Sequence, residues 1–199
     1  MKKRIFDVTA SFLGVLILAP FLIIVAIIIE IDSPGGIFYR QKRIGCHMKP
    51  FYLLKFRTMY AHSDRLGLLT IGNSDLRITE TGIWLRKYKL DELPQLFNIL
   101  LGDMSFVGPR PEVSKYVMCY TEAQLRVLTV KPGLTDLASI SFFNESELLS
   151  KSKDPEGFYL REIVPEKIRQ NLSYIDRRSF FGDMSIILKT LTMVMHQVN

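Results

Sequence analysis

The sequence predicts a mixed α/β fold that is mostly helical, with a small antiparallel sheet, an N-terminal membrane helix and amphipathic helices at the membrane interface. Three observations predict this fold class. Residues 12–29 are apolar and uncharged, residues 37–57 favour two strands joined by a turn, and later segments carry apolar residues at helical spacing. We therefore divide the chain into a membrane segment, residues 1–33, and a membrane-associated domain, residues 34–199.

The composition favours a membrane-associated protein exposed to a reducing compartment. The 199 residues carry a formal net charge of +6, and hydrophobic residues make up 48% of the chain. A basic and apolar chain fits an anionic membrane surface better than nucleic acid, and the sequence lacks a basic stripe with interleaved aromatic residues. Cys46 and Cys119 form neither a metal-ligand spacing nor a disulfide framework, which agrees with cytosolic exposure.

The apolar run at residues 12–29 predicts a helix that enters a membrane. As a straight helix it would reach about 27 Å, barely the thickness of a bilayer core. Pro20 should kink it, and basic residues flank it on both sides, whereas the positive-inside rule places them on one side of a spanning helix. From these residues alone, a bent spanning anchor and a helix that breaks at Ala19-Pro20 and leaves by the same face are about equally favoured.

Residues 37–41 and 51–57 predict a short hairpin. Both segments are rich in aromatic and branched side chains, and a turn-forming stretch separates them. Because side chains alternate along a strand, Lys55 and Arg57 should share one face and Phe56 should lie on the other. This face could bind an anion, and a solvated strand face is the alternative interpretation.

Two adjacent carboxylates, Asp91 and Glu92, precede a helix that should end at Gly102. Pro94 is tolerated in a first helical turn, which would place Asp91 at or near the N-cap, where the macrodipole favours negative charge. A carboxylate held ionised there would suit a nucleophile or a magnesium ligand for a phosphate-bearing substrate. The alternative is a capping Asp beside a solvated Glu.

Arg110 lies between Pro109 and Pro111, which fix the backbone around one guanidinium. This fork suits a phosphate or a pyrophosphate, although a rigid surface turn would have the same sequence. The other segments predict a loop over residues 61–77 and four helices, at 79–88 with Arg86 near its end, 114–128, 165–176 and 185–198.

Together these stretches resemble the bacterial sugar transferases, the monotopic phosphoglycosyl transferases that begin glycan assembly on polyprenol phosphate. The resemblance runs through nearly the whole chain. It is strongest in KFRTM (residues 55–59), LDELPQLFN (90–98) and GDMSFVGPRP (102–111). The length is similar to that of the minimal members, which have one re-entrant membrane helix and a compact catalytic domain.

The resemblance implies transfer of a phosphosugar from a UDP-sugar to undecaprenyl phosphate at the cytoplasmic face of the bacterial inner membrane. Asp91 and Glu92 match the family's catalytic pair. Asp91 would attack the β-phosphate, form a covalent phosphosugar intermediate and release UMP. Mg²⁺ near Asp91 and Glu92 would neutralise the diphosphate.

The resemblance also implies roles for residues outside the pair. Ala19-Pro20 matches the helix-breaking pair of the family, usually Ser-Pro, and so favours the re-entrant topology. The expected partners are the UDP-sugar, undecaprenyl phosphate and membrane lipids, without nucleic acid, and a homo-oligomer is left open. The residues expected to hold phosphate oxygens are Lys55, Arg57, Arg86 and Arg110. Pro111 is expected to set the pose of Arg110.

The sequence departs from the family pattern at two places. Lys89 stands where many members carry Ser before Leu-Asp-Glu. The usual Lys-Pro-Gly-x-Thr-Gly, followed by a Gln-Val-Asn/Ser-Gly-Arg stretch, becomes KPGLTDLASISFF at residues 131–143, with Asp136 in place of the glycine. Because the catalytic pair is intact, these departures bear on donor preference and not on the type of reaction.

Two other classes of function compete with this interpretation. A membrane-anchored scaffold for other glycan enzymes would work normally after Asp91→Asn, because its fold would survive. A nucleic-acid-binding protein is suggested by the net charge alone and leaves the apolar N-terminal run unexplained.

Overall fold

The computed structural model describes residues 2–61, 63, 69–71 and 75–196, so the loop expected at 61–77 and the end of the helix expected at 185–198 lie partly outside the described residues. The α-helices are α1 Lys2–Asp32, α2 Glu80–Lys87, α3 Gln95–Leu101, α4 Ser114–Val117, α5 Leu137–Ser141, α6 Glu145–Ser150, α7 Pro155–Phe158, α8 Val164–Arg177 and α9 Phe180–His196. The strands are β1 Phe38–Ile44, β2 Pro50–Phe56, β3 Ser105–Val107 and β4 Gly133–Thr135. The short helical turns are η1 Cys46–Met48, η3 Leu90–Glu92, η4 Gln124–Thr129 and the π-helical η5 Tyr159–Ile163.

The strands form two separate pairs. β1 and β2 make the predicted antiparallel hairpin, with Phe38 opposite Phe56 and Ile44 opposite Pro50. β3 and β4 pair in parallel, which the sequence analysis did not predict because three residues are too few to show an alternating pattern. The fold is therefore mostly helical with small sheets, as expected, but one of the two pairs is parallel.

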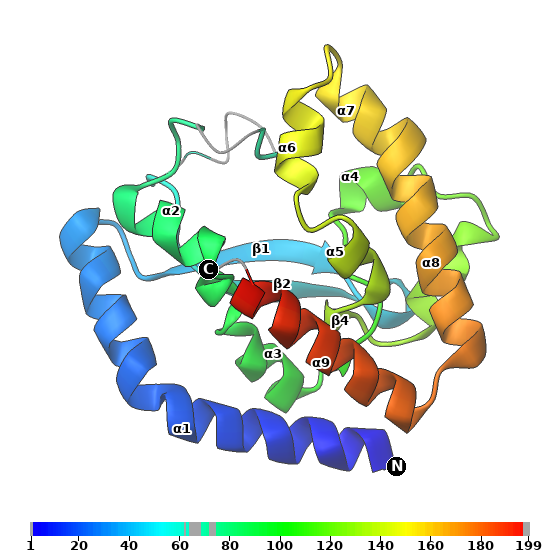
Figure 1. Cartoon of the computed structure of the whole chain (residues 1–199), viewed down its shortest axis with the longest axis horizontal. Helices are drawn as coiled ribbons and strands as arrows, with labels where there is room; N and C mark the ends of the chain where they lie inside the picture. The colour runs from blue at the N-terminus through cyan, green and yellow to red at the C-terminus, as the bar shows by residue number, and fades with distance from the viewer. Residues whose placement is uncertain (1, 62, 64–68, 72–74, 197–199) are drawn as a thin grey trace.

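Helix α1 runs along one edge of the molecule and bends part-way (Figure 1). The helix is continuous through Pro20. Proline has no backbone N–H to donate within a helix and commonly bends it. The predicted break at Ala19-Pro20 therefore takes the form of a bend. One face packs on α2 and α3 through buried side chains that include Val25 and Ile29. The hairpin and α3 lie between this helix and the rest of the domain (Figure 1).

Both ends of α1 are hydrogen-bonded to the same domain. Near its start, Lys3 Nζ donates to Val107 O at 2.8 Å and pairs with Asp183 at 2.7 Å. At its end, Asp32 Oδ2 accepts from Thr81 N at 3.1 Å. The two ends of the apolar helix therefore lie against one body of protein.

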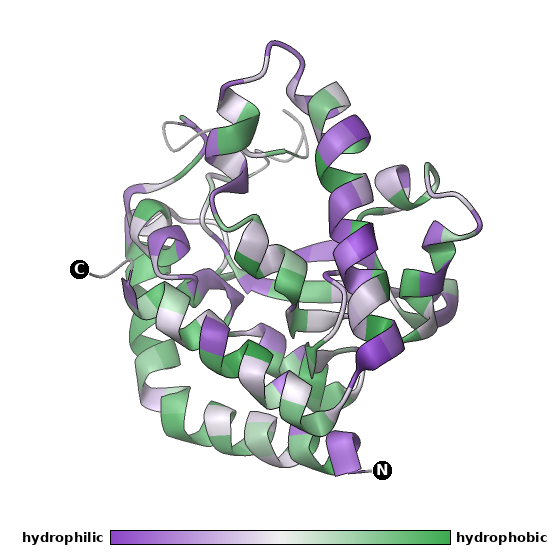
Figure 2. Cartoon of the chain, turned by 45° about the vertical axis from the view of Figure 1, so that its right-hand side comes forward, coloured by the Kyte–Doolittle hydropathy of each residue, from purple (hydrophilic) through white to green (hydrophobic). Residues whose placement is uncertain are grey.

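The outer face of α1 is apolar and uncovered. Among the described helices it alone is long and apolar enough to cross a membrane, and only 11% of its most apolar window is buried. In Figure 2 most of the α1 ribbon has the colour of hydrophobic residues. The large exposed apolar side chains of α1, between 44% and 78% accessible, are Ile5, Phe12, Leu13, Leu16, Ile17, Ile23, Ile24, Ile27, Ile28 and Ile31. So much exposed apolar surface indicates contact with membrane lipid.

The predicted helix at 114–128 is wrong, because the chain there forms α4 and η4 with a turn between them. Thr121 and Gln124 make a reciprocal pair of hydrogen bonds between side chain and backbone, which starts a new helical turn. The turn lets Tyr116 and Val127 enter the same core, beneath α8. The helices predicted at 165–176 and 79–88 are confirmed as α8 and α2, and α9 begins five residues before the predicted 185.

Candidate active site

Asp91 and Glu92 lie on η3, a single turn between α2 and α3. The prediction that Asp91 caps α3 is wrong, because Pro94 occupies the N-cap position. Lys89 adopts a left-handed conformation (φ 55°, ψ 21°) that reverses the chain after α2, and Glu92 N then donates to Lys89 O. The α3 macrodipole is therefore not what stabilises these carboxylates.

The two carboxylates are buried but have different partners. Asp91 is 6% exposed and Glu92 is 9% exposed. Lys55 Nζ lies 3.0 Å from Glu92 Oε1 and 3.9 Å from Asp91 Oδ2. Arg110 binds Glu92 with both terminal nitrogens, one of them at 3.1 Å from Oε2. Asp91 Oδ1, by contrast, is buried and has no hydrogen-bond partner within the described residues.

This difference in partners separates the acidities of the two groups. Burial raises the pKa of Asp91, and the charge of Glu92 adds to that effect against the opposing charge of Lys55. Burial acts on Glu92 in the same direction, but the charges of Arg110 and Lys55 outweigh it and hold the pKa of Glu92 well below its usual range. Glu92 is therefore a fixed anion, whereas Asp91 is a more basic carboxylate with a free oxygen.

Arg110 reaches the pair from the loop that follows β3. This loop runs close to the chain before β4, because Gly108 N donates to Thr135 O at 3.1 Å and a Cβ on Gly108 would lie 2.4 Å from Lys131 O. The backbone N–H of Arg110 donates to Asp136 Oδ2 at 2.9 Å. The predicted guanidinium fork is thus brought to the predicted carboxylate pair across 18 residues of sequence.

Of the other predicted phosphate-binding residues, Arg86 lies near the carboxylate pair, whereas Arg57 does not. Arg86 Nε donates to Thr58 Oγ1 at 2.9 Å; burial lowers the pKa of Arg86, and the charge of Asp91 opposes this. Arg57, 7% exposed, donates to the carbonyl oxygens of Ser33 and Pro34. Arg57 lies beyond the end of β2 and fixes the segment after α1. Although the alternation of side chains along a strand predicted that Arg57 shares a face with Lys55, its guanidinium does not lie at the site.

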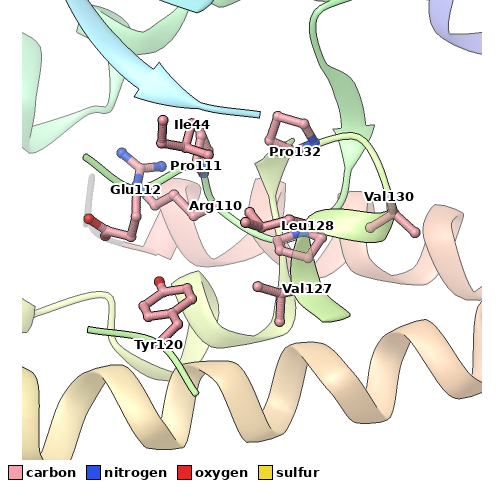
Figure 3. A pocket seen from close by; sticks show the side chains of 10 residues that line it. Ile44, Arg110, Pro111, Glu112, Tyr120, Val127, Leu128, Val130 and Pro132 are labelled. Atoms are coloured by element: carbon pink, nitrogen blue, oxygen red, sulfur yellow. The ribbon is translucent and has the colours of Figure 1, made fainter. Parts of the chain in front are cut away.

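Pro111 lies on the far side of the Arg110 loop. Its carbonyl accepts from Arg43 at 3.0 Å, and it lines a small pocket with Tyr120 and Val127 (Figure 3). The role of Pro111 in the pose of Arg110 stays a prediction.

The sequence analysis assigned no role to Asp136, although it noted the residue as a departure. The structure buries Asp136 to 1% exposure and makes it the N-cap of α5, where Oδ1 accepts from Ser139 N. An Asp directly before a short amphipathic stretch is the usual signal of an N-cap, and this signal could have been recognised.

The chain was compared with known proteins. A family model described as bacterial sugar transferase matches residues 1–197. The chain is 37% identical over 193 residues to the uncharacterized sugar transferase EpsL of Bacillus subtilis, covering 97% of this chain and 87% of the relative. It is 35% identical to a UDP-glucose:undecaprenyl-phosphate glucose-1-phosphate transferase of Caulobacter vibrioides, covering 96% and 68%. It is 32% identical to the exopolysaccharide production protein ExoY of Rhizobium meliloti, covering 98% and 85%.

Proposed function

Because the chain belongs to the bacterial sugar transferase family, we propose that it moves a sugar-1-phosphate from a UDP-sugar to undecaprenyl phosphate, as the first membrane step of exopolysaccharide assembly. The observation that carries the proposal is the buried Asp91 carboxylate, whose Oδ1 has no partner among the described residues. A free carboxylate oxygen surrounded by cations suits a nucleophile for a diphosphate, because the cations neutralise phosphates that would otherwise repel it.

The charges around the pair match such a donor. Four cations act on the two carboxylates, so positive charge predominates directly around the pair, as a negatively charged diphosphate requires. The cations are Lys55, Arg86, Lys89 and Arg110. Charge complementarity of this kind holds the phosphates in place and stabilises charge that develops during phosphoryl transfer.

The proposed reaction consists of two displacements at phosphorus. In the first, Asp91 Oδ1 bonds to the β-phosphorus of the donor, and the bond from that phosphorus to the oxygen bridging the two phosphates breaks, releasing UMP. In the second, a phosphate oxygen of undecaprenyl phosphate bonds to the same phosphorus, and the bond to Asp91 breaks, restoring the carboxylate. Glu92 keeps Lys55 and Arg110 beside the reacting phosphate throughout.

Mg²⁺ fits the site as an ion bound together with the donor. Within the described parts of the chain, no group of three or more His, Cys, Asp or Glu is placed to hold a metal alone. Asp91 Oδ2 lies 3.9 Å from Lys55 Nζ, beyond hydrogen-bonding distance, so this second oxygen could bind the ion while Oδ1 attacks. Mg²⁺ commonly takes one or two carboxylates and completes its shell with substrate phosphates. Asp91, with Glu92 adjacent, would hold the ion, which would neutralise charge on the diphosphate.

The contacts of α1 support a re-entrant helix at the cytoplasmic face of the membrane. A helix that crossed the bilayer would place its ends on opposite sides, yet Lys3 and Asp32 bind the same domain. A Lys2→Cys variant, made after Cys46 and Cys119 are replaced by Ser, tests the topology in intact cells. We expect no reaction with a membrane-impermeant thiol reagent, and labelling from outside would contradict the re-entrant topology.

The reaction is tested by UMP release from purified protein with undecaprenyl phosphate and Mg²⁺. UDP-glucose is the first donor to try, because it stands in the name of the Caulobacter vibrioides relative, and a panel of other UDP-sugars should follow. Asp91→Asn is the matched control, since the amide keeps the shape and loses the negative charge. We expect release with at least one donor and none from the variant. Equal release by both proteins would exclude Asp91 as the nucleophile, and a scaffold would release none.

A further inference from the structure

The two places where the sequence departs from the family pattern meet at the active site. Lys89 directly precedes the turn that carries Asp91 and Glu92, whereas Asp136 and Phe143 flank helix α5 about fifty residues later. In the folded protein, Lys89 Nζ lies 4.9 Å from the centre of the Phe143 ring. Asp136 holds the backbone of Arg110. The departures are thus brought together around the carboxylate pair.

Asp136 is built into the loop that presents Arg110. Its two carboxylate oxygens accept from two different backbone N–H groups, Oδ2 from Arg110 at 2.9 Å and Oδ1 from Ser139. The carboxylate is almost completely buried, so its hydrogen bonds are shielded from competition with water. It therefore ties the start of α5 to the residue whose guanidinium grips Glu92, and its charge also acts directly on Arg110.

Phe143 contacts the side chain of Lys89, as Asp136 contacts the backbone of Arg110. The Lys89 side chain is exposed, and within the described residues no carboxylate lies within 4.0 Å of its ammonium group. Its charge nevertheless acts on both Asp91 and Glu92. An aromatic face below an ammonium group attracts it and restricts its rotamers. Phe143 therefore keeps near the pair a cation that would otherwise extend into solvent.

We propose that Asp136 and Phe143 are positioning residues that set two cations, Arg110 and Lys89, around the Asp91–Glu92 pair for the diphosphate of the donor. This inference rests on the proposed function. It assigns two side chains of the divergent segment at residues 136–143 to the placement of charge, Asp136 acting through Arg110 and Phe143 acting through Lys89. A glycine at 136 could not hold Arg110 in this way, because it has no side-chain acceptor.

The test compares variants that remove each tether and keep the local fold. Asp136→Ser can still cap α5 but is too short to reach Arg110 N. Phe143→Leu keeps apolar bulk and loses the aromatic face, and Phe143→Tyr restores the face. Ser141→Ala, on the exposed side of the same helix and bonded to Gln170, is the control. Donor KM and kcat are measured by UMP release, with the midpoint of thermal unfolding recorded for each protein.

We expect Asp136→Ser to lower kcat/KM by about tenfold or more. Phe143→Leu should raise the donor KM about two- to fivefold, and Phe143→Tyr should return it to the wild-type value. The Phe143→Leu effect should shrink as salt is added, because Lys89 is exposed and its charge is screened. The Asp136→Ser effect should change little with salt, because the Asp136 carboxylate is buried. The control should match the wild type throughout.

The outcomes separate this inference from the proposed function. A fully active wild type with unchanged kinetics in Asp136→Ser and Phe143→Leu would overturn the inference and leave the proposed function standing. If Asp136→Ser does not fold, the comparison of Phe143→Leu with Phe143→Tyr decides alone, and equal KM values for these two would overturn it. A wild type that releases UMP from no donor would overturn the proposed function and the inference with it.

Discussion

Two buried clusters in this protein each place a lysine beside an aspartate, and they are built in opposite ways. Asp183 has both oxygens occupied, one by Lys3 at 2.7 Å and the other by the hydroxyl of Tyr174 at 2.7 Å. Asp91 has one buried oxygen without a partner in the described structure, and its closest cation is 3.9 Å away. The first cluster is balanced and joins α1 to α8 and α9. The second has excess positive charge and an unsatisfied acceptor.

This comparison teaches how a stabilising cluster differs from a reactive one. A buried acceptor without a hydrogen bond costs about 1–3 kcal/mol, so each such group in a fold calls for an explanation. In the Asp91 cluster, the proposed explanation is that Oδ1 is kept free to attack the β-phosphorus of the donor.

The largest effect should separate the two clusters by activity. Glu92→Gln removes the charge that anchors Lys55 and Arg110, so we expect turnover to fall by about a hundredfold. Asp183→Asn should leave the turnover of folded protein within about twofold of the wild type. UMP release, normalised to the folded fraction, checks both. Similar losses in the two variants would remove the distinction.

The next effect should separate the clusters by stability. Asp183→Asn replaces a carboxylate bound by Lys3 and Tyr174 with a neutral amide, and we expect it to lower the free energy of unfolding by about 2 kcal/mol. Denaturant titration in detergent measures this change. An unchanged midpoint would mean that the cluster does not fix the start of α1.

The response of stability to pH should have a definite sign at Asp91. Burial raises the pKa of Asp91 above its unfolded value, so the neutral form contributes stability that is present below the unfolded pKa and is lost as pH rises through the folded pKa. Asn cannot ionise. Asp91→Asn should therefore unfold at a higher temperature than the wild type at about pH 7, and the difference should vanish at about pH 3. An advantage that grew on acidification would contradict the raised pKa.

The smallest effect should come from the partly exposed member of the balanced cluster. Lys3 is 39% exposed, so solvent screens its ion pair with Asp183. We expect Lys3→Gln to cost about 1 kcal/mol or less, and we expect Arg126→Gln, at an exposed pair with Asp176, to cost less still. Thermal unfolding of the two variants side by side tests this order.

Some features could be predicted because their signals are local. Each of these features depends on a few consecutive residues with a characteristic pattern or turn chemistry. They are the hairpin, the end of α3 at Gly102, the helix α8 and the bend at Pro20. The family resemblance implied that Arg110 holds phosphate oxygens, but the ion pair of Arg110 with Glu92 was not predicted, because periodicity carries no long-range information.

Other predictions were wrong because the folded structure overrode the local sequence pattern. Arg57 alternates with Lys55 along the chain, yet the carbonyl groups after α1 take its guanidinium. Asp91 was expected at the cap of α3, but the left-handed backbone at Lys89 places it one turn earlier. The continuous helix expected at 114–128 is divided so that both halves can enter one core.

Residue type and spacing within about ten residues are enough to predict the helical character of this protein and its apolar N-terminal helix. They also reveal the adjacent carboxylates and the arginine between two prolines, as two separate local features. Only the tertiary structure decided that Lys3 meets Asp183, that Asp136 holds Arg110 and that Lys89 rests on Phe143. Contacts between residues so far apart form only when the packed elements bring them together, and packing is a property of the whole chain.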